Sequence, residues 1–512
     1  MSNLTNKPRL GDRLISNTVY LFLDWFVSSL ILFIFWIILG KTLSPFDLGI
    51  VSTSINLIIF ISTFSALGTS TALRKLIPEF KEKKGLKSVY PLVKLCFKPI
   101  LISLIIISLI LLLFSNQIIL FIFHDINSSL KYAFLICIFS IMIISIYNVL
   151  GSALYGLQNM RRFFLTNFVQ VLLRVLFAGL LIFLGFSFLG PLIGFLLAYF
   201  FVLFLRFNPD YLTSGKSVSY RKLFLYATPA LISSIAAALM VRGEYIILTA
   251  LKTPEITGIF TIAFTIASVI GLLVHAPSYG LFPIISALSI DKKTRKKQGY
   301  LIGLVLRYGL FLISPLSLLL IVFSNHAVLL FSTEEFLAST QYFPILIPGA
   351  ILYGIGCIFT FNLYNIGKPK IYRNIWVLSS LLFLILSLIL TTYFSALGLS
   401  FSYFITMLFM SLAGFIYINK FVKLNLFTGD LSKIFFTSLA ILSILFVIRP
   451  FIDNIFLLGI ILPPISLVYL GILLFTNFYR VEDVRILRYF GEKVPVVGKY
   501  ILTIANFVES RL

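Results

Sequence analysis

Long apolar runs, broken by short polar or Pro- and Gly-containing stretches, follow one another along the whole chain of 512 residues. A helix needs roughly 20 apolar residues to cross a bilayer. By that criterion the pattern predicts about fourteen transmembrane helices, and therefore an all-α polytopic membrane protein. The predicted spans are residues 14–39, 48–73, 90–115, 131–157, 163–184, 187–207, 222–250, 257–281, 299–323, 340–365, 374–394, 397–419, 432–450 and 455–479.

The composition agrees with this pattern, and the charge distribution predicts the topology. Hydrophobic residues make up 60% of the chain and the mean hydropathy is +1.06, far above the values of soluble domains. If the N-terminus is cytoplasmic, the loops and tails on that side hold 32 of the 41 basic residues, and the opposite loops hold 4. Because Lys and Arg in short loops stay in the cytoplasm, we expect a multi-pass protein of the cell membrane with both termini cytoplasmic. The net charge of +23 then needs no nucleic-acid partner.

Two halves of the chain repeat at a fixed distance of 209 residues. Each copy contains six predicted spans, an even number, so both copies enter the membrane in the same sense. We expect an N-terminal six-helix lobe at 1–208, a C-terminal six-helix lobe at 209–425, and an appended helix pair with a basic cytoplasmic tail at 426–512. The alternative is chance, because Pro and Gly recur in any set of short loops. The matched positions are Pro45 with Pro254, Gly49 with Gly258, Lys83 and Lys84 with Lys292 and Lys293, and Tyr155 with Tyr364.

Charged residues inside the predicted spans are the main candidates for function, because charge at that depth costs at least about 2.5 kcal/mol. Transporters commonly place their substrate near the midplane between two repeats. We therefore expect a central cavity that contains a net positive charge, and arginine is well suited to bind phosphate there. The cavity candidates are Arg242, Arg174, Glu244, Asp24 and Arg307, and the candidates for guiding phosphate at the inner face are Lys94 and Lys98.

A purely structural role remains open for each of these residues. Asp24 and Glu244 would then pair with the arginines and fix the helix packing, whereas Lys94, Lys98 and Arg307 would extend to the inner membrane interface. Four polar residues of the spans would line the same cavity or form hydrogen bonds between helices. These four are Asn56, Asn148, Asn167 and Gln170.

The sequence lacks the common motifs of enzymes and ATP-driven pumps. It contains no GxxxxGK[ST], HExxH or GxSxG. Cys96, Cys137 and Cys357 lie in or beside apolar segments without CxxC spacing, so they are interpreted as packing residues. We therefore expect a protein that is not an enzyme, with no cofactor and no metal site.

Three loops carry a resemblance to a known family. They are LGKTLSPFDLGI after the first span, LYGLQNMRRF on the inner side and LKTPEITGIFTIA after the seventh span. In these loops and in its two six-span halves, the chain resembles the polysaccharide or oligosaccharide flippases, relatives of the lipid II flippases and of the multidrug and toxin extrusion carriers. The resemblance covers about residues 10–420.

This resemblance implies a flippase that moves a lipid-linked oligosaccharide, on a polyprenyl phosphate or diphosphate, from the cytoplasmic to the outer leaflet by alternating access. Cationic cavity residues of the family bind the lipid phosphates, and Arg242 and Arg174 fit that role, with Arg307 as a third candidate. The coupling ion would be H⁺ or Na⁺. Two alternatives stay open: an ion-coupled exporter of small molecules with the same fold and a smaller, more acidic cavity, and a membrane-embedded glycosyltransferase or polymerase.

Overall fold

The chain is helical throughout its described part, without a strand there. The structure is a computed structural model that describes residues 10–212, 219–288, 294–452, 455–480, 483–485, 488, 492 and 498–509. The predicted all-α membrane fold with two repeats is confirmed. The helices of the first half are α1 (Leu10–Thr42), α2 (Pro45–Ser65), α3 (Thr69–Lys84), η1 (Leu86–Ser88), α4 (Val89–Leu113), α5 (Ser115–Phe123), α6 (Ser128–Gly156), α7 (Met160–Phe183), α8 (Leu189–Arg206) and η2 (Pro209–Leu212).

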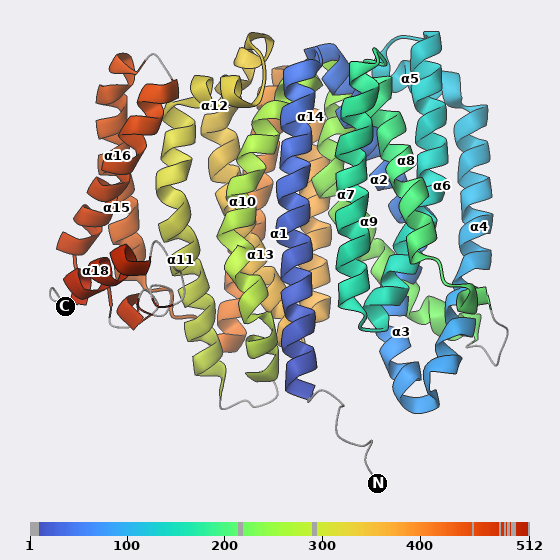
Figure 1. The fold of residues 1–512 in the computed structure, drawn as a ribbon, viewed down its shortest axis with the longest axis horizontal. Helices are drawn as coiled ribbons and strands as arrows, with labels where there is room; N and C mark the ends of the chain where they lie inside the picture. Colours follow the sequence, from blue (N-terminus) through green and yellow to red (C-terminus); the bar gives the residue numbers. More distant parts are fainter. Residues whose placement is uncertain are drawn as a thin grey trace.

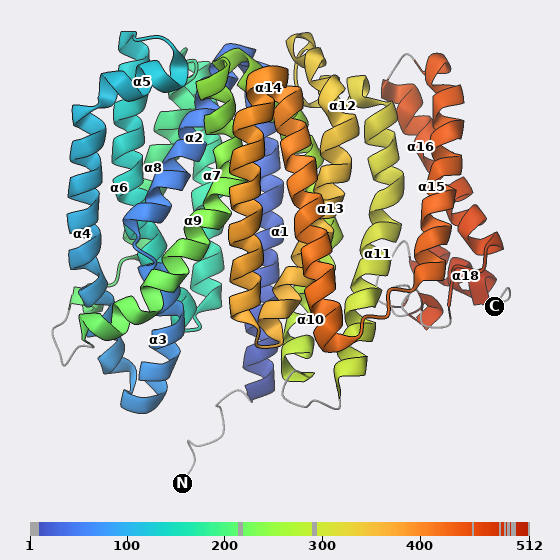
Figure 2. The same cartoon turned by 180° about the vertical axis from the view of Figure 1, so that it is seen from behind.

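The second half repeats this order and adds a helix pair. One long helix, α14, is bent at Ser395, whose backbone angles are not helical (φ 54°, ψ −139°). Figure 2 shows its two limbs side by side, so α14 supplies both predicted spans 374–394 and 397–419. The helices are α9 (Tyr220–Leu251), α10 (Pro254–Leu288), α11 (Arg295–Val322), α12 (Ser324–Phe331), η4 (Glu334–Tyr342), α13 (Phe343–Asn365), α14 (Pro369–Val422), α15 (Thr428–Ile448), η5 (Arg449–Phe451), α16 (Ile455–Phe475) and α18 (Gly498–Glu509).

Twelve helices in the described residues are long and apolar enough to cross a membrane. One of the twelve is the bent α14, and the apolar stretch of α16, Gly459–Phe475, is shorter than the twelve. The total of fourteen spans therefore stays a prediction.

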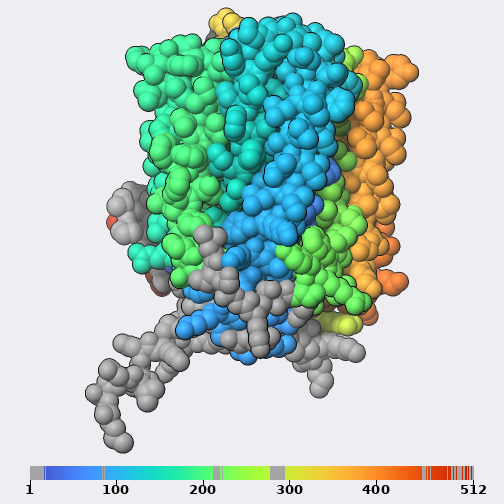
Figure 3. Space-filling view, turned by 90° about the vertical axis from the view of Figure 1, so that its right-hand side faces the viewer, coloured from blue at the N-terminus to red at the C-terminus, as the bar shows by residue number. Residues whose placement is uncertain are grey.

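The helices form two bundles side by side (Figure 1). Helix α1 stands between α7 of the first half and α10 of the second, and the pair α15 and α16 lies at the far edge. The start of α1 and helix α3 lie at one end of the molecule, called here the basic end, and the short helices α5 and α12 lie at the opposite end. Seen from the edge formed by the first half, blue to green helices make one continuous face (Figure 3).

The repeat predicted from a few loop residues extends through the helix boundaries. Helices α2 and α10, α5 and α12, and α7 and α14 each start 209 residues apart, as Pro45 and Pro254 show. Helices α1 and α9, α4 and α11, and α6 and α13 each end 209 residues apart, as Thr42 and Leu251 show. The offset stays at 209 residues, without a gap, over most of both halves. Pro and Gly residues that recur by chance in loops would not produce such a constant offset.

The two repeats meet where α2 and α10 begin, through two glycines that the repeat relates. A Cβ placed on Gly49 would lie 1.7 Å from the carbonyl oxygen of Pro254, and one placed on Gly258 would lie 1.9 Å from that of Pro45. Both distances are far inside van der Waals contact, so only glycine allows this backbone approach. Nearby, the Thr261 hydroxyl donates to that of Ser52 at 3.0 Å, again across the same offset. The contact is therefore reciprocal, and it joins the two halves at the end opposite the basic end.

The pair α15 and α16 packs against the second half through its own apolar cluster. Leu319 and Val322 of α11 contact Ile441 and Leu445 of α15 and Tyr469 of α16. This cluster is separate from the large core that both halves share. The pair is thus an attachment to the two-lobed core and contributes no helix to the interface between the lobes.

Replacing Gly258 by Ala is expected to lower the melting temperature of the purified protein. The added methyl group overpacks the contact with Pro45, at a cost of about 1–3 kcal/mol. A Cβ placed on Gly179 of α7 would have nothing within 4 Å, so Gly179→Ala serves as the control and should keep or slightly raise the melting temperature. Equal melting temperatures for Gly258→Ala and the wild type would contradict the close contact.

Candidate functional site

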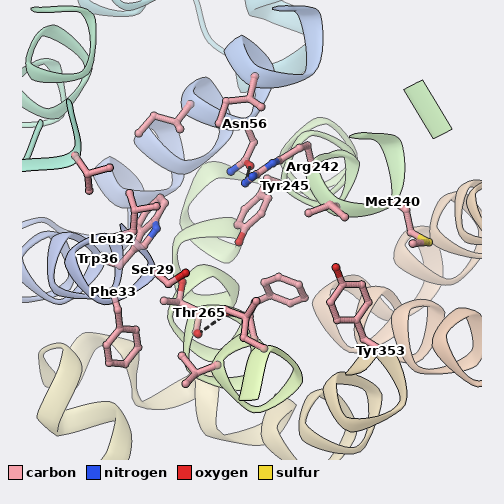
Figure 4. Close-up of a pocket in the computed structure, with 18 of the residues that line it drawn as sticks. Ser29, Leu32, Phe33, Trp36, Asn56, Met240, Arg242, Tyr245, Thr265 and Tyr353 are labelled. Carbon is pink, nitrogen blue, oxygen red and sulfur yellow. Dashed lines mark hydrogen bonds between the residues drawn. The ribbon is translucent and has the colours of Figure 1, made fainter. Parts of the chain in front are cut away.

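A cavity of about 400 Å³ lies between the two halves. Its lining residues come from α1, α2, α7 and α8 of the first half and from α9, α10, α13 and α14 of the second. Figure 4 shows Trp36 and Phe33 on one side, Arg242 beside Asn56 on another, and Tyr353 across the cavity from them. The volume is at the lower end of the range for small-molecule sites.

The cavity lies on the axis that relates the repeats. Six pairs of its lining residues are 209 positions apart, so each pair comes from equivalent places on α1 and α9 or on α2 and α10. The members of a pair differ in chemistry, and Phe33 opposite Arg242 shows the largest difference. The pairs are Leu32 and Val241, Phe33 and Arg242, Trp36 and Tyr245, Ile55 and Phe264, Asn56 and Thr265, and Ile59 and Ser268.

Two arginines face this cavity, from opposite halves of the chain. Arg242 donates from Nη1 to Oδ1 of Asn56 at 3.1 Å. Arg174 is 5% exposed, and its guanidinium carbon lies 4.1 Å from the ring centre of Phe35 and 4.6 Å from that of Phe195. Stacking of this kind stabilises the cation but uses no hydrogen-bond donor. Within the described residues, Arg174 forms no hydrogen bond and its buried Nε has no partner.

The charge of the cavity is not balanced by its lining. No aspartate or glutamate is among the described residues that line it. Neither Arg174 nor Arg242 is within 4.0 Å of a carboxylate oxygen in the described part of the chain. Gln170, one of the predicted polar candidates, also lines the cavity and has a buried amide nitrogen without a partner there. The site therefore offers unused donors and two positive charges.

Glu244 lies two residues from Arg242 but points elsewhere. Its side chain is fully buried, it does not line the cavity, and neither carboxyl oxygen has a hydrogen-bond partner in the described part of the chain. Residues two apart on a helix face different directions, and this explains the separation from Arg242. A carboxyl group in such surroundings needs a proton or a cation, because an isolated buried carboxylate is costly.

Asp24 belongs to a second polar network, in the first half, and does not line the cavity. Its Oδ1 accepts from Nδ2 of Asn167 at 2.8 Å. The amide oxygen of Asn167 in turn accepts from the Tyr147 hydroxyl at 2.9 Å and from Arg206. Arg206, the last residue of α8, is 2% exposed and also donates to Thr166 at 3.0 Å. Asp24 thus has a structural partner, but this partner is the amide of Asn167, and no arginine forms an ion pair with Asp24 among the described residues. Arg206 is linked to Asp24 only through Asn167.

Arg307 also lies outside the cavity, although the sequence led us to expect it in the cavity lining. Its Nη1 and Nη2 each donate to the Asp483 carboxylate at 2.8 Å, and its Nε lies 2.8 Å from Oδ2 of Asp430. Tyr308 donates to Asp483 as well, and Arg480 pairs with Asp430 at 2.8 Å. These contacts tie α11 to α15 and to the segment after α16. The reason for the wrong location is that both carboxylates come from the C-terminal attachment, which has no counterpart in the repeat.

Lys94 and Lys98 lie on the exposed face of α4, away from the cavity. Farther along the same helix this face continues with exposed apolar side chains such as Ile105 and Leu109. The position fits lysines that extend from a lipid-facing helix toward the membrane interface. Their predicted role in guiding phosphate stays a prediction.

The cavity also has an aromatic part, which was not predicted from the sequence. Trp36, Tyr199, Tyr245, Phe264, Tyr353 and Tyr403 line the cavity. Apolar rings inside apolar spans carry no signal of their own, since most of them pack in the core or face lipid. The 209-residue offset would have found one pair, because Trp36 and Tyr245 occupy equivalent positions beside Phe33 and Arg242.

Two repeated helix bundles around one shared cavity define a polytopic membrane protein with a transporter fold. A family model described as polysaccharide biosynthesis protein matches residues 14–289, more than half of the chain. The chain therefore belongs to this family, and the predicted family relationship is confirmed. Among curated proteins, none matches this sequence.

Solved structures share the fold. The lipid II flippase MurJ in an inward closed conformation is 18% identical, covers 88% of this chain and 97% of its own, and has a TM-score of 0.69. An inward-facing multidrug resistance MATE family transporter of the MOP superfamily is 14% identical over 80% of this chain and 94% of its own, with a TM-score of 0.62. A MOP superfamily transporter from Pyrococcus furiosus is 16% identical over 80% and 95%, with a TM-score of 0.54.

The Asp483 cluster predicts how the C-terminal attachment responds to acid. Burial raises the pKa of Asp483, but the hydrogen bonds from Arg307 and Tyr308 outweigh it, so the pKa lies below the ordinary value of 3.8. Because the pKa of Asp483 is lower in the folded state, the stabilisation that its ionised carboxylate contributes is complete above pH 3.8. This stabilisation is lost as the pH falls through the lower, folded-state pKa. The protection factor of the α15 amides, which is the exchange rate corrected for the intrinsic effect of pH, should therefore be high at pH 7 and should fall once the pH drops below 3.8.

The variant Asp483→Asn should give fast exchange of α15 already at pH 7, because Arg307 loses one of its two buried partners, at a cost of about 3 kcal/mol. Glu509→Gln is the matched control, since the Arg488–Glu509 pair is about half exposed and such pairs contribute about 0–1 kcal/mol. If both variants exchange at the wild-type rate, the cluster does not hold the attachment.

Proposed function

We propose that the protein is a flippase that moves a lipid-linked oligosaccharide, on a polyprenyl phosphate or diphosphate, from the cytoplasmic to the outer leaflet by alternating access. The product would serve the synthesis of a cell-surface polysaccharide or a protein-linked glycan. The observation that carries this proposal is the pair Arg174 and Arg242 in a cavity between the repeats, without a carboxylate partner in the described residues. A phosphate group would supply the missing negative charge and accept several of the unused donors.

The family description and the fold support the same reading. The family is described by polysaccharide biosynthesis, and MurJ is a lipid II flippase by name. The alternative, an ion-coupled exporter of small molecules, has the fold similarity of the MATE structures in its favour. It predicts a smaller, more acidic cavity, and although the cavity here is small, its described lining carries two arginines and no acidic side chain.

We further propose that Glu244 binds the coupling ion, H⁺ or Na⁺. Its carboxyl group is fully buried on α9, two residues from Arg242, and has no hydrogen-bond partner among the described residues. A proton or a cation bound there would change the charge beside the phosphate site and so couple ion binding to phosphate binding. The basic end, which the distribution of Lys and Arg predicts to be cytoplasmic, is the side from which the lipid would enter.

The first test uses the source organism with the gene deleted. Complete lipid-linked oligosaccharide should accumulate in the cytoplasmic leaflet, as measured by leaflet-selective labelling and mass spectrometry. Complementation with Arg242→Gln or Arg174→Gln should restore less than about a tenth of the transport, because losing one charge-assisted phosphate contact costs about 1.5–3 kcal/mol. Arg221→Gln is the control, since Arg221 is exposed at the start of the same helix, α9.

Three outcomes would contradict the flippase proposal. A truncated glycan in the deletion strain would indicate a transferase or polymerase. Unchanged lipid-linked sugars would indicate export of small molecules. Full complementation by both cavity variants would remove the arginines from the mechanism.

Glu244→Gln tests the ion separately, in vesicles that contain the purified protein. The glutamine keeps the shape of the side chain but cannot release a proton or balance a cation. Transport should persist without stimulation by a pH or Na⁺ gradient, whereas the wild type should be stimulated by one of the two. Undiminished stimulation in Glu244→Gln would place the coupling site elsewhere.

A further inference from the structure

The cavity has two walls of different chemistry. One wall, called here the cationic wall, contains Arg174, Arg242 and Asn56. The other, called here the aromatic wall, contains Tyr245, Phe264, Tyr353 and Tyr403 of the second half. In Figure 4 the hydroxyl groups of Tyr245 and Tyr353 point toward the space between the walls, and Arg242 lies across it from Tyr353.

The rings of the aromatic wall hold one another in place. Phe264 contacts Tyr245 with ring centres 6.0 Å apart and planes at 85°, and it contacts Tyr403 at 5.3 Å and 80°. Edge-to-face contacts of this kind are the favoured geometry of aromatic pairs. Tyr245 and Tyr403 are 6% and 5% exposed, so both rings are packed inside the protein.

The hydroxyl groups of Tyr245 and Tyr403 form no hydrogen bond with the described residues, although both residues are buried and line the cavity. Buried polar groups in proteins are nearly always hydrogen-bonded. A phenol in this position therefore has capacity left for a guest that carries hydroxyl groups of its own.

The repeat indicates that three rings of the aromatic wall, those of Phe264, Tyr353 and Tyr403, are not needed to build the fold, whereas Tyr245 has an aromatic equivalent in Trp36. The 209-residue offset lays Phe264 on Ile55, Tyr353 on Ile144 and Tyr403 on Gly194 in the first half. Equivalent positions in the same helix arrangement thus accept aliphatic residues and glycine. The aromatic wall belongs to the second half alone, and it faces the donors of the cationic wall.

We propose that the aromatic wall binds the sugar attached directly to the phosphate, so that the protein selects its lipid by the innermost sugar. This inference rests on the proposed flippase function, with phosphate at the cationic wall. A pyranose has apolar faces, which match aromatic rings, and hydroxyl edges, which match the phenol groups of Tyr245 and Tyr403. A cavity of about 400 Å³ suits a phosphate headgroup with its adjacent sugar rather than a whole oligosaccharide. The distal glycan then stays outside the cavity and does not contribute to the selection of the lipid.

The test measures binding of two lipids to the purified full-length protein in detergent. The probes are undecaprenyl diphosphate and undecaprenyl diphosphate that carries a single hexose. The wild type should bind the hexose-bearing lipid roughly 10-fold more tightly, since two hydrogen bonds to its hydroxyl groups are gained. Tyr245→Phe and Tyr403→Phe should each reduce that advantage roughly 3-fold and leave the affinity for bare undecaprenyl diphosphate unchanged.

Tyr393→Phe is the matched control, because Tyr393 is 78% exposed at the bend of α14. Equal affinity of the wild type for both lipids would overturn the sugar site while leaving the proposed function intact. If Tyr403→Phe weakened the binding of both lipids equally, the sugar site would also be overturned, because the hydroxyl group would then contribute to phosphate binding or to the fold. Binding of neither lipid would refute the proposed function, and the sugar site with it.

Discussion

The backbone contact between α2 and α10 is the constraint on which the rest of this structure depends. Gly49 and Gly258 let the two helices start against each other's first carbonyl group, and both helices then continue along the cavity with Asn56 and Thr265. Side chains at the two glycines would separate the repeats by the thickness of a methyl group or more. The cavity would then lose the alignment that brings Arg242 within hydrogen-bond distance of Asn56.

Four buried or half-buried arginines of this protein divide into two groups by the partners of their guanidinium groups. Arg307 has Asp430 and Asp483 within 2.8 Å, and Arg206 donates to the neutral side chains of Asn167 and Thr166. Arg174 and Arg242 lack a carboxylate in the described part of the chain, and the guanidinium of Arg174 lies against the rings of Phe35 and Phe195. A buried cation without a counterion is unfavourable. Because Arg174 and Arg242 line the cavity, a ligand bound there can supply the negative charge that they lack.

Most of the fold could be predicted from the sequence, whereas only part of the site could. Hydrophobic runs of membrane length, the distribution of Lys and Arg and the offset of Pro45 and Pro254 are local signals, and they predicted the helices and the repeat. The cost of charge in a bilayer drew attention to Arg174 and Arg242, and the structure places both in the lining of the cavity. The same cost selected Asp24 and Arg307, whose partners Asn167 and Asp483 are brought near by tertiary contacts that no spacing reveals. Aromatic residues such as Tyr403 gave no signal because apolar spans contain many rings.

The position of the cavity on the repeat axis has a consequence for symmetry. Two identical chains related by a twofold axis must carry the same residue at both equivalent positions, so a homodimer of one half would have Phe at both places or Arg at both. A single chain that contains both halves is free of this rule, and here Phe33 faces its counterpart Arg242 across the cavity. Because the two halves are parts of one chain, equivalent positions can carry different residues. The site on the axis can therefore be polar on one side, while the surrounding backbone keeps the symmetry of the repeat.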